Sequence, residues 1–189
     1  MKHAKLKDYI YVIKNALSLN LCDEILNEFK DSDEWIDTVV GKQTNVNKNI
    51  RNCKTIGISF PLIIQKNSEI RHKLDNIIYS EVTKCIKKYN DKFPHCKIEE
   101  DSGYELLKYS EGCFYIQHVD SFKAAPRSVS CSFILNDDFE GGEFAFFDRE
   151  LIYKLEKGDA LMFPSSFMYP HEIMPVTKGI RYSMITWFI

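Results

Sequence analysis

The chain has 189 residues, of which 44% are hydrophobic, and its formal net charge is −2. This length and composition favour one globular domain with a hydrophobic core, and the charge provides no basic field that would attract nucleic acid. The first eight residues contain no apolar run, and no stretch reaches the roughly 18 apolar residues of a membrane span. We therefore expect no signal peptide, no membrane partner and a cytoplasmic location.

The cysteines form no CxxC pair that would indicate a zinc-thiolate site. Reduced thiols in a cytosolic protein are the simpler interpretation, and they suit a protein that uses a reduced metal. The six positions are Cys22, Cys53, Cys85, Cys96, Cys113 and Cys131.

Helical patterns dominate the first 100 residues. Residues 9–13 predict a short strand, and Ser18 or Asn20 can cap a helix over residues 21–29. Apolar residues at three- and four-residue spacing predict a second helix over residues 68–88. The polar, Asn-rich stretch 41–52 between them is either a solvated surface loop or a mobile lid over a substrate groove.

After residue 100 the pattern changes to short strands separated by Gly- and Asp-containing turns. Together with the helices, these strands predict a mainly β protein of the α+β class whose core is a jelly roll, in a single domain over residues 1–189. Residues 1–100 would give helical support and the lid, and residues 101–189 the jelly-roll core. The predicted strands cover residues 105–109, 114–120, 128–135, 143–147, 151–153, 160–163 and 181–189.

His118 and Asp120 are two residues apart in a predicted strand, so their side chains project from the same face. His171 follows after an apolar strand and would have to reach the same point from a neighbouring strand. Two imidazoles and one carboxylate form the facial triad that holds non-haem Fe(II) with open coordination positions. The same ligand types bind zinc in hydrolases, but the histidines there usually share a helix as HExxH, which this sequence lacks.

Arg181 lies in an apolar strand ten residues after His171. A cation in such surroundings needs an anionic partner, and a guanidinium matches a carboxylate with two hydrogen bonds. We therefore expect Arg181 to hold the far carboxylate of a bound keto-acid. His3, His72 and His95 lie outside these patterns, and we expect them to be surface or structural residues.

In this order the motifs resemble the 2-oxoglutarate/Fe(II) dioxygenase superfamily, and within it the prolyl 4-hydroxylase branch. The resemblance covers residues 104–189. The matching motifs are Tyr109-x-x-Gly112-x-x-Tyr115-x-x-His118-x-Asp120, Gly141-Gly142-Glu143-Phe144, Lys157-Gly158-Asp159 with the apolar run to Pro164, His171-Glu172-x-x-Pro175-Val176-x-x-Gly179-x-Arg181-Tyr182, and Trp187.

The resemblance implies a double-stranded β-helix, the cupin-like form of the jelly roll. It implies Fe(II) held by His118, Asp120 and His171, and 2-oxoglutarate held by Arg181 with help from the Tyr109 hydroxyl. It also implies that Trp187 lies against the cosubstrate or substrate, that O2 is consumed, and that ascorbate serves as reductant. Two positions depart from known branches. Many collagen-type members have Lys where this chain has Arg181, and the oxygen-sensing members have a second tyrosine near the position of Ile134.

The branch implies hydroxylation of an unactivated C–H, foremost on a prolyl residue of a protein or peptide, with release of succinate and CO2. Tyr115 and Arg127 are candidate substrate contacts, with residues 45–52 closing over the site. A free amino acid or small metabolite is the alternative substrate. A methylated nucleobase is a third, although demethylases of this superfamily carry a second arginine at the position of Trp187.

A non-enzymatic cupin-like binding module is the remaining interpretation, which the complete ligand set disfavours. The sequence leaves the oligomeric state open. Core packing is the default role expected of four phenylalanines, and lining of the pocket is the alternative: Phe133, Phe144, Phe146 and Phe163.

Overall fold

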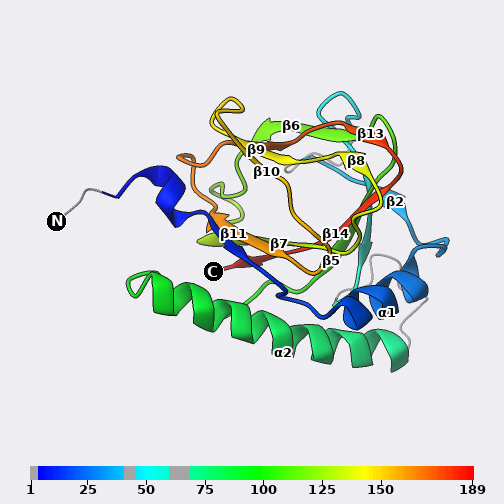
Figure 1. Cartoon of the computed structure of the whole chain (residues 1–189), viewed down its shortest axis with the longest axis horizontal. Helices are drawn as coiled ribbons and strands as arrows, with labels where there is room; N and C mark the ends of the chain where they lie inside the picture. The colour runs from blue at the N-terminus through cyan, green and yellow to red at the C-terminus, as the bar shows by residue number, and fades with distance from the viewer. Residues whose placement is uncertain (1–3, 41–45, 60–68) are drawn as a thin grey trace.

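The computed structural model describes residues 4–40, 46–59 and 69–189 (Figure 1). Two antiparallel sheets lie one above the other, and both long helices lie beneath the larger sheet. The described part of the chain is thus mainly β with few helices, which confirms the predicted jelly roll with N-terminal helices.

The larger sheet has strand order β1-β11-β7-β14-β5-β4-β2, and every pairing within it is antiparallel. Three of its strands come from the first 60 residues, so the N-terminal part of the chain extends both edges of the sheet. The strands are β1 (Tyr11–Ile13), β2 (Ile36–Asp37), β4 (Lys54–Gly57), β5 (Glu105–Tyr109), β7 (Val129–Ile134), β11 (Ala160–Pro164) and β14 (Arg181–Phe188).

The smaller sheet has strand order β10-β9-β12-β6-β3, and a separate pair joins β13 to β8. Its strands are short, from two to five residues. They are β3 (Arg51–Asn52), β6 (Phe114–His118), β9 (Phe144–Phe146), β10 (Leu151–Tyr153) and β12 (His171–Ile173), and the separate pair is β8 (Glu140–Gly141) with β13 (Val176–Lys178).

Helix α1 (Leu19–Phe29) begins at Ser18, whose side chain accepts a hydrogen bond from the Leu21 N–H and caps the first turn. Helix α2 (Glu69–Lys92) turns one apolar face toward the larger sheet. Because side chains alternate along a strand, every second residue of β5, β7 and β14 packs toward the helices, as Phe133 and Met184 do. The residues between them face the smaller sheet.

The first helix and most strands lie within one or two residues of their predicted positions. The strand predicted over residues 114–120 ends at His118, so Asp120 lies just beyond it. Residues 6–9 form a 3-10 helix before β1, and α2 continues to Lys92. Residue 68, where α2 was predicted to begin, lies outside the described residues.

Strands β2, β3 and β4 were not predicted, and they add sheet structure to the N-terminal part that was expected to be helical. Of the predicted lid, residues 41–45 lie outside the described residues. The rest forms a turn and β3, which pairs with β6. This part of the lid is therefore an edge strand of the smaller sheet.

Packing of α2 on the sheet can be tested at two adjacent positions. Ile78 is fully buried in the core beneath the sheet, whereas the side chain of Tyr79 is 59% exposed. We predict that Ile78→Ala lowers the free energy of unfolding by about 2–5 kcal/mol, because it removes apolar contacts and leaves a cavity. Tyr79→Ala should change it by less than about 0.5 kcal/mol. Urea unfolding measures both, and equal losses would contradict the packing described.

Candidate active site

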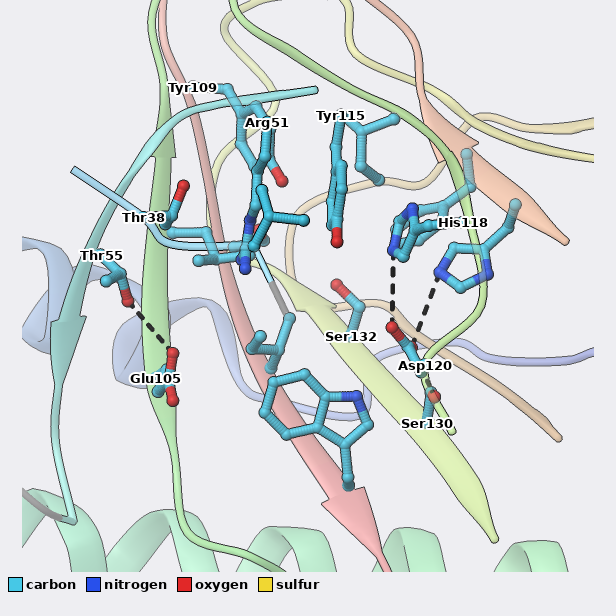
Figure 2. A pocket seen from close by; sticks show the side chains of 18 of the residues that line it. Thr38, Arg51, Thr55, Glu105, Tyr109, Tyr115, His118, Asp120, Ser130 and Ser132 are labelled. Atoms are coloured by element: carbon cyan, nitrogen blue, oxygen red, sulfur yellow. Dashed lines mark hydrogen bonds and ion pairs between the residues drawn. The ribbon is translucent and has the colours of Figure 1, made fainter. Parts of the chain in front are cut away.

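A pocket of about 450 Å³ opens between the two sheets (Figure 2). One wall comes from the residues of β5, β7 and β14 that point away from the helices, and the other from β6, β9 and β12. Residues 36–40, Arg51 and Phe122 also line the pocket. The N-terminal part of the chain therefore contributes to the pocket itself.

His118, Asp120 and His171 meet at one side of this pocket. His171 on β12 lies directly opposite His118 on β6, and Asp120 follows β6 by two residues. The Nε2 atoms of His118 and His171 lie 3.4 and 3.6 Å from the two carboxylate oxygens of Asp120. One ligand atom from each residue falls within 4.8 Å of the others, and these three residues are the one such group found in the described chain.

Both imidazoles are oriented by backbone carbonyls. Nδ1 of His118 lies 2.9 Å from the Ile116 oxygen, and Nδ1 of His171 lies 3.1 Å from the Tyr169 oxygen. A carbonyl oxygen only accepts hydrogen bonds, so Nδ1 carries the hydrogen and Nε2 keeps its lone pair. Burial lowers the pKa of His171 to about 4, so this imidazole is neutral at pH 7. In each ring Nε2 is thus the nitrogen that faces Asp120.

Asp120 is held in place by hydroxyl groups on its other side. The Ser130 hydroxyl donates to Oδ2 of Asp120 at 2.6 Å and pairs with the Ser165 hydroxyl at 2.7 Å. Burial alone would raise the pKa of Asp120, but the neighbouring histidines and the Ser130 hydroxyl outweigh it and lower the pKa. The carboxylate is therefore ionised, with Oδ1 directed toward His118.

Arg181 begins β14 at the inner end of the pocket, and only 1% of it is exposed. Its Nη1 donates to the Ser183 hydroxyl at 2.8 Å, while Nε and Nη2 have no hydrogen-bond partner among the described residues. Burial lowers the pKa of its guanidinium. A buried cation with unused donors costs free energy unless an anion compensates its charge. No carboxylate of the described residues forms a salt bridge with Arg181.

Tyr109 and Tyr115 separate Arg181 from the mouth. Tyr109 is buried on β5 with its ring 5.3 Å from the Arg181 guanidinium carbon. The Tyr115 ring makes two contacts. It stacks on the His118 ring with 3.5 Å between ring centroids, and the Arg51 guanidinium carbon lies 4.9 Å from its centroid. Figure 2 shows Arg51 and Tyr109 on one side of Tyr115, with His118 and Asp120 on the other.

Trp187 lines the pocket, but its contact is with another side chain. The Arg127 guanidinium carbon lies 3.5 Å from the centre of the Trp187 ring, and Arg127 also donates to the Asp120 carbonyl at 3.1 Å. Phe144 and Phe163 line the pocket, the alternative to the core packing that was their default expectation. Phe133 packs toward the helices and Phe146 packs behind His171, so neither belongs to the lining.

The remaining histidines lie apart from the pocket. His72 and His95 are exposed, and His3 lies outside the described residues. Several residues at the site were not predicted from the sequence, notably Ser130, Ser165, Arg51 and Glu105. The alternation of serines with apolar residues in β7 was a usable signal, because a hydroxyl inside a buried strand needs a polar partner.

Comparison with known proteins identifies the segment that carries this site. Residues 104–189 match the family model described as the 2OG-Fe(II) oxygenase superfamily. This segment contains both histidines, the aspartate and Arg181, in the geometry just described. The match therefore covers the metal-ligand cluster and Arg181 but leaves out the N-terminal residues that line the pocket.

Curated relatives carry the name PKHD-type hydroxylase. One from Idiomarina loihiensis is 38% identical over 88 residues, covering 43% of this chain and 39% of the relative. Another from Rippkaea orientalis is 33% identical over 133 residues, covering 66% of this chain and 57% of the relative. The chain thus matches between two fifths and three fifths of the length of these oxygenases.

Solved structures share the fold across nearly the whole chain. A prolyl hydroxylase from Trichoplax adhaerens, in complex with a peptide of hypoxia inducible factor, has a TM-score of 0.75 at 22% identity, covering 96% of this chain and 83% of that one. A prolyl-4-hydroxylase from Pseudomonas putida has a TM-score of 0.69 at 19% identity, covering 95% and 91%. At these identities the likeness establishes the jelly-roll fold.

The donor set fits the Fe(II) of a 2OG-Fe(II) oxygenase. Two neutral imidazoles and a carboxylate on one side leave further coordination positions directed into the pocket. The unpaired Nε and Nη2 of Arg181 fit a carboxylate that enters the same pocket. Metal ligands and carboxylate anchor are thus both accessible from one cavity.

The effect of the Ser130–Asp120 hydrogen bond on the site can be tested by measuring the affinity for a metal ion. We predict that Ser130→Ala weakens Mn(II) binding by about 10–100-fold, because the hydroxyl fixes the orientation of the carboxylate. Ser132→Ala is the matched control, since Ser132 lies two residues along the same face and its hydroxyl has no partner among the described residues. Calorimetric titration gives both dissociation constants, and equal values would show that Ser130 does not orient Asp120.

Gly142 controls the position of Arg181. It has a φ of +68°, and a Cβ there would lie 2.8 Å from the Cδ of Arg181. We predict that Gly142→Ala weakens 2-oxoglutarate binding by about tenfold or more, because a charged hydrogen bond contributes about 1.5–3 kcal/mol.

Gly112→Ala is the control for backbone strain in that measurement. Gly112 has a φ of +77°, but a Cβ there would have no described atom within 4 Å. Both variants carry the cost of a left-handed residue, about 1–2 kcal/mol. If Gly112→Ala weakens 2-oxoglutarate binding as much as Gly142→Ala does, contact with Arg181 is not the cause.

Proposed function

We propose that this chain is a 2-oxoglutarate-dependent dioxygenase that hydroxylates an unactivated C–H, foremost that of a prolyl residue in a protein or peptide. The observation that carries the proposal is the buried Arg181, with two unused donors in the same pocket as the His118, Asp120 and His171 cluster. Metal alone would not require a buried cation nearby, whereas a dicarboxylate that spans metal and guanidinium accounts for both.

In this proposal His118, Asp120 and His171 hold Fe(II), and Arg181 with Tyr109 holds the far carboxylate of 2-oxoglutarate. The metal then supplies the activation of O2, and the overall reaction converts 2-oxoglutarate to succinate and CO2 while one oxygen enters the substrate. Ascorbate is the proposed reductant that keeps the metal in the Fe(II) state. Phe144 and Phe163 keep water from the inner end of the pocket.

The mouth of the pocket favours a peptide with an apolar group at its reacting position. Ile36, Val39 and Phe122 are exposed large apolar residues, and all of them line the pocket. Arg127, fixed by Trp187 and the Asp120 carbonyl, lies beside this rim and is the proposed contact for the substrate backbone. The volume suits 2-oxoglutarate together with one small side chain.

The names of the relatives support a hydroxylase. We also propose that the described N- and C-terminal parts act as one catalytic domain, because residues of both line the pocket. No helix in the described ranges is long and apolar enough to cross a membrane. A cytoplasmic location is proposed from the cysteine pattern of the sequence. A free amino acid is the second candidate substrate, because the same cavity would enclose one completely.

Activity of the protein can be tested on proline-containing peptides with Fe(II), 2-oxoglutarate, ascorbate and O2. We predict that mass spectrometry finds one added oxygen on proline, with a matching amount of succinate. His171→Ala should abolish both products, because it removes a metal ligand. His72→Ala on the exposed face of α2 is the matched control and should keep full activity.

Three results of this assay distinguish the proposals. Succinate without modified peptide would keep the dioxygenase assignment and contradict the peptide substrate. Succinate that persists in His171→Ala would contradict the assigned metal ligands. Absence of both products with every peptide and with free amino acids would contradict the proposed reaction.

A further inference from the structure

Two cysteines lie opposite each other where β3 meets β6. Arg51 pairs with Tyr115 and Asn52 with Phe114 in this antiparallel ladder. Continuing the same register by one residue places Cys53 opposite Cys113. Neither cysteine is in a disulfide in the structure.

The hydrogen bonds of the ladder show which kind of pair this is. The Ile116 N–H donates to the Ile50 oxygen, so hydrogen-bonded and non-hydrogen-bonded pairs alternate from there toward Cys53 and Cys113. The carbonyls of both cysteines turn outward: Cys53 accepts from Thr38 at 3.1 Å and Cys113 accepts from Val176 at 3.0 Å. The described ladder ends one pair earlier, at Asn52 and Phe114. Continued by one pair, it has a non-hydrogen-bonded position here, a type for which Cα atoms typically lie about 4.5 Å apart, within the roughly 4.4–6.8 Å that a disulfide spans.

Both side chains point to the same face of the ladder. The Arg51 guanidinium lies over the Tyr115 ring, and side chains two residues further along the two strands share that face. Cys53 belongs to the apolar cluster around Tyr109, and Cys113 packs against the same cluster.

The two thiols differ in access to solvent. Cys113 is partly exposed, whereas Cys53 is buried, with 4% of its surface exposed. This asymmetry suits a pair in which an outer thiol meets the oxidant and an inner thiol resolves it. Cys85 and Cys131 are buried in the core beneath the larger sheet and lack this access.

We propose that Cys53 and Cys113 form a reversible cross-strand disulfide when the protein meets a peroxide. The Cys113 thiol gives up its proton, and the resulting thiolate attacks one peroxide oxygen while the O–O bond breaks. The other oxygen leaves with that proton as water, and Cys113 becomes a sulfenic acid. The Cys53 sulfur then attacks the Cys113 sulfur, an S–S bond forms, and the hydroxyl leaves as water with the Cys53 proton. Two thiols and one hydrogen peroxide thus give one disulfide and two waters, and a thiol reductant reverses the step.

Oxidation has a consequence for the pocket, and this part rests on the proposed function. In the reduced protein Cys53 packs in the same apolar cluster as Tyr109, whose ring lies 5.3 Å from the Arg181 guanidinium carbon, and the Cys53 sulfur lies 3.4 Å from the Thr38 hydroxyl oxygen. A bond to Cys113 moves the Cys53 sulfur and changes the packing beside Tyr109. We expect the oxidised form to bind 2-oxoglutarate several-fold more weakly, because Tyr109 is then displaced from its position facing Arg181.

The disulfide is tested by treating the whole reduced protein with hydrogen peroxide and mapping it by mass spectrometry after trypsin digestion. Cleavage at lysine and arginine gives peptides 52–54 and 109–123, each with a single cysteine. We expect these two peptides linked, two hydrogens lighter than their sum, and separated again by dithiothreitol. Cys113→Ser and Cys53→Ser should each abolish the link, and Cys113→Ser, at the more exposed position, preserves the test if Cys53→Ser does not fold.

Cys96 is the internal control, because it is also partly exposed but lies outside this ladder. Oxidation of Cys113 to sulfinic acid while Cys53 stays a free thiol would overturn the proposal. So would a link from Cys113 to Cys96. The mapping needs no metal or cosubstrate, so its failure is distinct from failure of the proposed reaction. Equal 2-oxoglutarate dissociation constants for linked and reduced protein, both loaded with Mn(II), would overturn the effect on binding alone.

Discussion

The buried guanidinium of Arg181 is the constraint on which the arrangement of the pocket depends. A cation removed from water needs compensation, yet the described residues provide Arg181 only the Ser183 hydroxyl and the faces of Tyr109 and Phe144. Such a group is tolerated when the rest of the fold is stable, and it favours any anion that enters. The glycine at position 142 allows this packing, because a larger residue would displace the arginine side chain.

Strand alternation links this cation to the metal ligands. β7 and β14 send one set of side chains into the helix-covered core and the other set, including Ser130 and Arg181, into the pocket. The core side anchors the sheet, so polar groups on the pocket side are held in fixed positions. Pairing of His171 with His118 then brings the smaller sheet to the correct place for a shared metal site. Stability and chemistry are thus carried by opposite faces of the same strands.

The sequence was sufficient to predict the jelly roll and the side chains that now meet in one pocket, because residue type, order and strand spacing each limit the possibilities. It was insufficient for β2 and β3, since strands of two residues have no measurable periodicity and their pairing is long-range. Arg51 was missed for that reason. Phe133 has the core position that was its default expectation, and the serines on the opposite face of β7 mark the register that separates core from pocket.

The most direct measurement is a crystal structure of the protein grown without oxygen in the presence of Mn(II) and 2-oxoglutarate. Our account predicts one metal ion on Nε2 of His118, Nε2 of His171 and Oδ1 of Asp120. It also predicts 2-oxoglutarate with its far carboxylate on the Nε and Nη2 of Arg181, the two donors that have no described partner. A keto-acid bound with its far carboxylate away from Arg181, or a metal bound elsewhere, would contradict it.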